Sequence, residues 1–262
     1  MHVLTTDLDR TFIFSERTIG IPLEETRCIE QLDGKPISYI SNKTAQLMEE
    51  VTARNIDIIP VTTRSLAQYA RIELFQQKVP HYAVACNGGF VLRNGEVDEE
   101  WSKIVAKNVS TCLSFDDFRT RFAACWEMEM FRKINGVDEL FYVLLIDEAK
   151  KDIDALNALH EQFQQVDWTT YLHGKKFYAL PKTLSKEAAV TYVLDKIQPT
   201  VHYAAGDSFM DLGMMQLTDT HFSPQHGEIY EKLGDASPVR VLDARGAAFT
   251  EQMLEELIAN VQ

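Results

Sequence analysis

The chain has 262 residues, 45% of them hydrophobic, and its 26 basic and 39 acidic side chains give a net charge of -13. A chain of this size and composition buries a sizeable core and forms one large domain or two smaller ones. The acidic balance disfavours nucleic acid and anionic membranes, so we expect neither as a partner. An anionic substrate would need local help, most simply from a metal ion.

Strands that end in polar residues alternate with helices in the first part of the chain. Three such strands are expected: residues 3–6 followed by Asp7 and Asp9, residues 56–61 followed by Thr62, Thr63 and Arg64, and residues 82–86 followed by Asn87 and Gly88. Ser41 and Ser65 can each cap a helix between them. The segment 12–35 is expected to be irregular. This alternation predicts a parallel sheet covered by helices.

The pattern changes after about residue 90. Strand-like segments at residues 140–146, 166–172 and 176–180 are accompanied by expected helices at residues 114–128 and 149–164. Strands joined by hairpins predict an antiparallel sheet with helices on one side. We therefore expect an α/β fold with an α+β cap domain, residues 89–180, inserted into a Rossmann-like core of residues 1–88 and 181–262.

The chain then returns to the core pattern. A helix is expected from Lys186 to about residue 197, and a strand at residues 201–205 runs into Asp207, Ser208 and Asp211. A last strand near residues 239–242 and a helix at about 246–259 follow. His202, inside an apolar strand, is expected to be a core histidine and not a ligand.

Polar groups that follow parallel strands share one crevice at the edge of the sheet, the usual ligand site of such folds. Asp7, Asp9, Thr62, Asn87 and Asp207 are expected to meet there. Taken alone, an Asp-x-Asp pair equally fits a solvated turn. Carboxylates, a hydroxyl donor and the cation of Lys186 together are what an aspartyl-phosphate mechanism needs.

Four short motifs follow one another in order and span nearly the whole chain. They are Asp7-Leu8-Asp9-Arg10-Thr11, Val61-Thr62-Thr63-Arg64, Lys186 within Leu184-Ser185-Lys186-Glu187-Ala188, and Gly206-Asp207-Ser208-x-x-Asp211. In these motifs the sequence resembles the haloacid dehalogenase superfamily of phosphatases. It is most similar to the branch with an inserted α/β cap, which includes Cof-type sugar phosphatases and sucrose-phosphate phosphatases.

The resemblance implies a role for each matched residue. Asp7 would be the nucleophile and Asp9 the general acid and base. Mg²⁺ would be held by the Asp7 carboxylate, the Asp9 backbone carbonyl and the Asp207 carboxylate. Thr62 would bind a phosphoryl oxygen and Lys186 would balance the negative charge. The remaining expected site residues are Ser208 and Asp211, which support these groups, and Thr63, Arg64, Asn87, Gly88, His173, Lys175 and Lys176, which would bind substrate.

Asp211 is expected to orient Lys186 or a metal-bound water, without binding the metal itself. His173, Lys175 and Lys176 lie at an expected hairpin tip of the cap, where a solvated loop is the plain alternative to a role in substrate selection. Arg10, Thr63 and Met210 differ from the commonest family pattern, which has glycine at the first two positions and often asparagine at the third. These departures prevent the transfer of a substrate from the family.

The expected function is a Mg²⁺-dependent phosphatase acting on a small phosphorylated metabolite, with a sugar phosphate as one candidate. Two alternatives stay open: a phosphomutase with the same nucleophile, and a non-catalytic phosphate-sensing module. The four cysteines show no CxxC spacing, and no long uncharged apolar stretch is present. We therefore expect reduced thiols in a cytoplasmic protein without a signal peptide or transmembrane helix, either a monomer or a homodimer.

Overall fold

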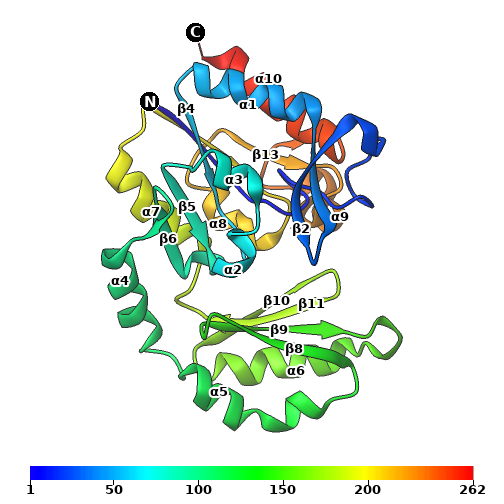
Figure 1. Cartoon of the computed structure of the whole chain (residues 1–262). Coiled ribbons are helices and arrows are strands. Elements are labelled where there is room, and N and C mark those ends of the chain that lie inside the picture. Colours follow the sequence, from blue (N-terminus) through cyan, green and yellow to red (C-terminus); the bar gives the residue numbers. More distant parts are fainter. Residues whose placement is uncertain (262) are drawn as a thin grey trace. The chain divides into compact units, whose positions relative to one another are not determined.

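A computed structural model describes residues 1–261, which form two compact units (Figure 1). The first unit comprises Met1–Asp98 and Lys186–Gln262, and the second comprises Glu99–Ser185. The expected junctions at residues 89 and 180 differ from these. Residues 90–98 stay with the first unit because β6 (Phe90–Arg93) pairs with β5 (Tyr82–Ala85), and Pro181 stays with the second because it pairs with Trp168.

The first unit is built on a sheet of five parallel strands. Their order across the sheet is β14 (Val241–Leu242), β13 (His221–Pro224), β12 (Val201–Ala205), β1 (His2–Thr6) and β4 (Ile56–Pro60). The central strand β1 is buried from Val3 to Thr6, and Thr6 pairs with Ala205 on one side and Pro60 on the other. The Rossmann-like parallel core is therefore confirmed, with Asp7 one residue beyond the central strand.

Helices complete the first unit. Ser41 Oγ accepts a hydrogen bond from Thr44 N and begins α1 (Asn42–Ala53), as expected, and α1 lies beside α10 (Ala247–Asn260) (Figure 1). The others are α2 (Leu66–Tyr69), α3 (Glu73–Gln77), α7 (Lys186–Ile197), α8 (Leu212–Met215) and α9 (Glu228–Leu233). A third strand, β7 (Glu96–Val97), extends the hairpin of β5 and β6. This unit has its own apolar core, which includes Leu4, Leu8, Phe222 and Leu254.

The expectation that residues 12–35 are irregular is wrong. An antiparallel hairpin forms there from β2 (Thr26–Leu32) and β3 (Lys35–Ser41). Asp33 and Gly34 make its turn, with φ angles of 52° and 73°. An Asp-Gly pair with two positive φ values is the preferred two-residue hairpin turn, so the dipeptide itself carried the missed signal.

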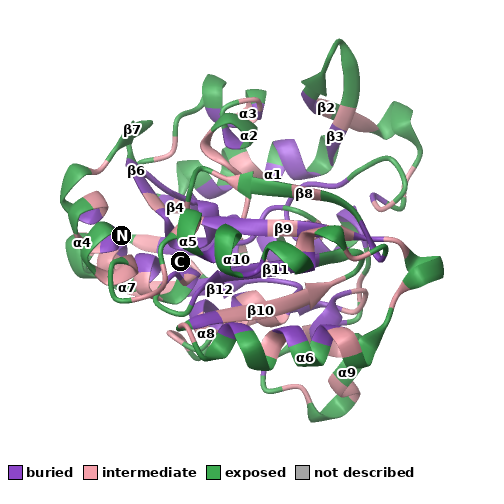
Figure 2. Cartoon of the chain, turned by 90° about the horizontal axis from the view of Figure 1, so that it is seen from below, coloured by how far each residue is buried: buried purple, intermediate pink, exposed green. Residues whose placement is uncertain are grey.

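The second unit contains a four-stranded antiparallel sheet in the order β10 (Trp168–His173), β11 (Lys176–Pro181), β9 (Phe141–Ile146) and β8 (Phe131–Val137). Most of the buried residues of this sheet lie in β9 and β11, whereas β8 is largely exposed (Figure 2). Its helices are α4 (Glu99–Val109), which the sequence analysis missed, α5 (Phe115–Arg121) and α6 (Ile153–Gln164). The inserted α+β unit is therefore confirmed.

The expected helix at residues 114–128 ends early. After α5, residues Ala123–Glu127 form a 3₁₀ turn. Phe118 on α5 stacks on Trp168 with ring centroids 3.7 Å apart, and this aromatic cluster is the core of the second unit. All four cysteines are free thiols, as expected. Among residues 1–261, no helix combines the length and the apolar character needed to cross a membrane.

Candidate functional site

Polar residues that follow the strands of the first unit meet at one edge of its sheet. Backbone hydrogen bonds continue the sheet beyond β1, since Asp7 N donates to Ala205 O at 2.9 Å. Thr62 N likewise donates to Val84 O at 2.8 Å, and Asn87 N donates to Thr62 O at 2.9 Å. These bonds hold Asp7, Thr62 and Asn87 on neighbouring strands, at the carboxyl ends where ligands of such sheets bind.

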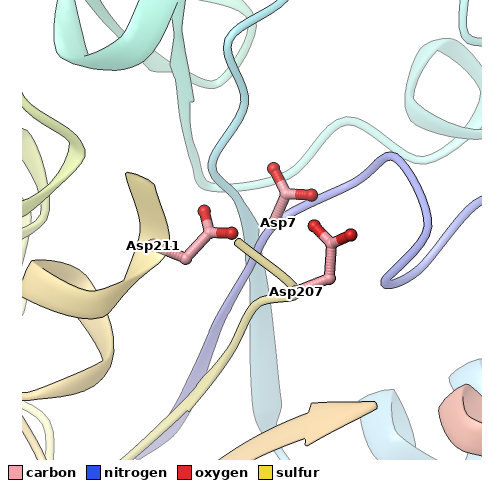
Figure 3. Close-up of side chains that lie close together, drawn as sticks. All are labelled: Asp7, Asp207 and Asp211. Atoms are coloured by element: carbon pink, nitrogen blue, oxygen red, sulfur yellow. The ribbon is translucent and has the colours of Figure 1, made fainter. Parts of the chain in front are cut away.

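Three buried carboxylates, those of Asp7, Asp207 and Asp211, gather at this edge (Figure 3). One oxygen atom from each lies within 4.8 Å of the others. Asp7 is 7% exposed, Asp207 2% and Asp211 0%. Carboxylates that are this close together and this well shielded from water are unstable unless positive charges lie among them, so the cluster requires cations.

Lys186, the first residue of α7, supplies one of these cations. Its Nζ lies 2.5 Å from Asp7 Oδ1 and 2.6 Å from Asp211 Oδ1, and the residue is only 2% exposed. Burial alone would lower the pKa of Lys186, but the carboxylates of Asp211 and Asp7 outweigh burial and raise it. Lys186 is therefore a permanent ammonium that joins the first and fourth motifs.

Asp211 uses both of its oxygens within the protein. While Oδ1 accepts from Lys186, Oδ2 accepts from Ser208 N at 3.0 Å and from Ser208 Oγ at 2.8 Å. Gly206 makes this turn possible, because a Cβ at that position would lie 2.3 Å from Asp211 Cβ. Asp211 thus orients Lys186 and has little capacity left for a metal ion.

The donor chemistry of the cluster fits a hard divalent cation such as Mg²⁺. Asp7 and Asp207 are the carboxylates that fit best, and the backbone carbonyl of Asp9 is the expected third oxygen. Burial raises the pKa of Asp7 to about 7, although Lys186 acts in the opposite direction. A further positive charge beside Asp7 would favour its ionised form, which is the form that binds metals.

Asp9 lies apart from the buried cluster, with a side chain that is 54% exposed. Both of its oxygens accept hydrogen bonds from Arg64, at 2.7 Å from Nε and 2.7 Å from Nη2. Arg64 Nη1 in turn donates to Glu30 Oε2 at 2.7 Å, and Arg71 Nη2 donates to Glu30 Oε1 at 3.1 Å. Arg64 is therefore fixed between an exposed and a fully buried carboxylate, a contact that the sequence analysis did not anticipate.

The second motif and the Asn87 turn lie next to Asp7. Thr62 is 1% exposed, and its Oγ1 accepts a hydrogen bond from Arg64 N at 3.2 Å, whereas Thr63 is half-buried. Asn87 and Gly88 have φ angles of 55° and 96°, so the backbone forms a left-handed turn here. Turns of this kind can direct backbone N–H groups toward a bound anion. Thr62, Asn87 and Gly88 are thus buried, and backbone hydrogen bonds hold Thr62 and Asn87 on neighbouring segments.

His173, Lys175 and Lys176 belong to the second unit. His173 pairs with Lys176 where β10 and β11 turn, and Gly174 at the tip has a φ of 56°. Lys175 and Lys176 are exposed and His173 is half-buried. The expected hairpin tip is therefore present, and these residues are in a different unit from the carboxylates.

Sequence reasoning missed Glu30, the one charged residue of the β2–β3 hairpin that is completely buried. It accepts hydrogen bonds from Ser38 Oγ at 2.6 Å as well as from both arginines. The Asp-Gly turn could have revealed the hairpin, but no local pattern marks Glu30 as the partner of a residue in the second motif.

No family model and no curated protein matches the sequence. Comparison with solved structures identifies the fold as that of the haloacid dehalogenase-like hydrolases, which confirms at the level of fold the resemblance drawn from the motifs. One neighbour is sucrose-phosphatase from Synechocystis, solved in complex with sucrose and phosphate. Its TM-score is 0.69 at 17% identity, and the alignment covers 99% of this chain and 97% of that chain.

Two further neighbours are haloacid dehalogenase-like hydrolases. The one from B. subtilis has a TM-score of 0.60 at 12% identity, with 98% of this chain and 100% of that chain covered. The one from Bacteroides thetaiotaomicron has a TM-score of 0.56 at 14% identity, with 98% and 99% covered. Because both units are covered, the likeness extends to the core together with the insertion.

Proposed function

We propose that this chain is a Mg²⁺-dependent phosphatase that hydrolyses a small phosphorylated metabolite through an aspartyl-phosphate intermediate. The observation that carries the proposal is the buried contact of 2.5 Å between Lys186 Nζ and Asp7 Oδ1. The contact holds Asp7 Oδ1, so Oδ2 would be the oxygen that attacks phosphorus. A buried carboxylate nucleophile needs positive charge beside it to approach an anionic ester, and the Lys186 ammonium supplies part of that charge.

In the first step, Asp7 Oδ2 forms a bond to phosphorus while the bond between phosphorus and the leaving oxygen breaks, and Asp9 donates a proton to that oxygen. In the second step, Asp9 takes a proton from water as the water oxygen attacks phosphorus and the bond to Asp7 breaks. Lys186 balances charge on Asp7, and Thr62 binds a phosphoryl oxygen. A divalent cation held by Asp7 and Asp207 would supply the positive charge that offsets repulsion between nucleophile and phosphate.

The contact between Arg64 and Asp9 adds a requirement to this mechanism. Proton donation needs a hydrogen on an oxygen of Asp9 that, in the structure, accepts a hydrogen bond from Arg64. Donation from Arg64 to both oxygens suits an accepting carboxylate, so a protonated Asp9 would have to direct its O–H away from Arg64 and toward the leaving oxygen. Arg64 thereby holds Asp9 in a non-donating arrangement, at a site where its side chain is still accessible to solvent.

The experiment is a screen of phosphorylated metabolites for phosphate release, with and without Mg²⁺, using the full-length protein. Sugar phosphates come first, because the Synechocystis neighbour binds sucrose and phosphate. Wild-type protein should release phosphate only with Mg²⁺, and Asp7→Asn should be inactive since an amide is a far poorer nucleophile. The matched control is Asp195→Asn, an exposed position on α7.

The outcomes separate the proposal from its alternatives. Full activity in a clean Asp7→Asn preparation would refute the assignment of the nucleophile. Conversion of one phosphorylated isomer into another, without release of phosphate, would identify a phosphomutase. Stable labelling of Asp7 by a small phosphodonor without turnover would identify a phosphate-sensing module.

A further inference from the structure

Arg10 directly follows the Asp7 and Asp9 pair, and its backbone has a φ of 66°. A positive φ strains an L residue that bears a side chain, whereas glycine adopts it without cost. The motif that this sequence resembles commonly has glycine at this position. The chain thus keeps a long cationic side chain where the backbone geometry favours glycine, so the side chain itself needs an explanation.

His226 holds both the backbone and the side chain of Arg10. Arg10 Nη2 donates to His226 O at 2.6 Å, and His226 Nε2 lies 2.7 Å from Arg10 O. Gly246 N donates to His226 Nδ1 at 3.2 Å, so Nδ1 is the acceptor and Nε2 carries the hydrogen. Burial lowers the pKa of His226, in agreement with this neutral tautomer. Arg10 is therefore a fixed group, unlike a freely moving surface arginine.

This fixed guanidinium lies against the carboxylate cluster. Arg10 Nε is 3.7 Å from Asp207 Oδ2, and the Asp207 side chain is 3% exposed. Arg10 Nε is itself buried and has no hydrogen-bond acceptor among residues 1–261. The contact is thus a close charge pair and not a hydrogen bond.

Charge balance then indicates a function for Arg10. When Asp7, Asp207 and Asp211 are all ionised, three negative charges in the buried cluster face the two positive charges of Lys186 and Arg10. Arg10 Nη2 also lies 4.0 Å from Glu231 Oε1, but Glu231 is exposed and water screens that pair. A divalent cation at Asp7 and Asp207 would meet a guanidinium that already neutralises one of its two ligands. We propose that Arg10 is an internal counter-cation for Asp207, which lowers the affinity of the site for Mg²⁺ in the absence of substrate.

This inference rests on the proposed metal site and deepens it, because it concerns how tightly the free protein holds the ion. Two cations that share one carboxylate repel each other, so removing the charge of Arg10 should strengthen Mg²⁺ binding. We expect a gain in affinity of about tenfold at moderate salt, where a contact at this depth is only partly screened.

The test is isothermal titration calorimetry of Mg²⁺ into the full-length protein at constant ionic strength and without substrate. Arg10→Gln removes the charge and keeps most of the length, and Arg10→Gly also removes the backbone strain and so protects the fold. Both variants should bind Mg²⁺ about tenfold more tightly than wild type. Arg10→Lys, which restores the charge, should return to within about threefold of wild type.

Arg54→Gln is the matched control. Arg54 follows α1 and precedes β4, at the opposite edge of the sheet from Asp7, and its partner Glu50 is partly exposed. The Arg54→Gln variant should bind Mg²⁺ with the same affinity as wild type. The midpoint of thermal unfolding, measured against Mg²⁺ concentration, gives a second readout: it should begin to rise at lower Mg²⁺ in the two neutral variants.

Equal or weaker Mg²⁺ binding by Arg10→Gln and Arg10→Gly would overturn the inference, as would a complete lack of Mg²⁺ binding in every protein. If wild type still shows Mg²⁺-dependent phosphate release, the proposed function survives that result. Absence of phosphate release together with normal, Arg10-sensitive Mg²⁺ binding would instead remove the proposed function and keep the role of Arg10.

Discussion

Glu30→Gln should destabilise the first unit. Glu30 is fully buried and neutralises two guanidinium groups, those of Arg64 and Arg71. Removing one member of a buried ion pair costs about 3–5 kcal/mol, because the remaining charge stays buried without compensation. The Arg71 side chain is 33% exposed and can regain water, and Arg64 keeps Asp9. We therefore expect a loss near the lower limit, about 3 kcal/mol.

Urea titration measures this loss. For a chain of this length, a decrease of about 3 kcal/mol should lower the urea midpoint by about 1 M. Circular dichroism follows both units, whereas the tryptophans, Trp101, Trp126 and Trp168, all lie in the second unit, so fluorescence reports that unit. Comparing the two signals locates the loss in the first unit without assuming a single transition.

Glu49→Gln is the matched control, since Glu49 is exposed on α1. It should change the free energy of unfolding by no more than about 0.5 kcal/mol. A loss below about 1 kcal/mol in Glu30→Gln would refute the reasoning, because it would mean that the two arginines do not depend on a buried counter-charge.

Asp9→Asn should lower turnover by about two to four orders of magnitude, while calorimetry still detects Mg²⁺; unchanged turnover with lost binding would contradict the acid/base role. Burial lowers the pKa of His202 from 6.5 to about 4. Between these two pH values the unfolded chain binds a proton that the folded chain does not, so the free energy of unfolding rises with pH. Urea titrations at several pH values across this range should show that His202→Gln lacks about 2 kcal/mol of the rise, a figure reduced because the side chain is partly exposed. The same dependence on pH in His202→Gln and wild type would contradict this assignment. Replacing His173, Lys175 and Lys176 together should change metabolite preference much more than activity on a small aryl phosphate, whereas equal losses would assign them to folding or phosphate binding.

The sequence by itself determined the parallel core, the inserted unit and the strand ends that carry Asp7, Thr62 and Asp207. Buried strands are recognised locally as apolar runs, and parallel strands bring their carboxyl ends to one edge of the sheet. The core position predicted for His202 is reached only in part: His202 lies in such a run and its Nε2 hydrogen-bonds Thr5 Oγ1 at 2.9 Å, but the residue is half-buried.

Only the tertiary structure decided which charges pair. Glu30 and Arg64 are 34 positions apart, and Arg64 and Asp9 are 55 apart. The distance of Arg10 from Asp207 likewise depends on His226, which reaches Arg10 from 216 positions away. Ion-pair partners depend on side-chain length and burial once segments distant in the sequence pack together. The order of residues along the chain does not give the distances between those side chains.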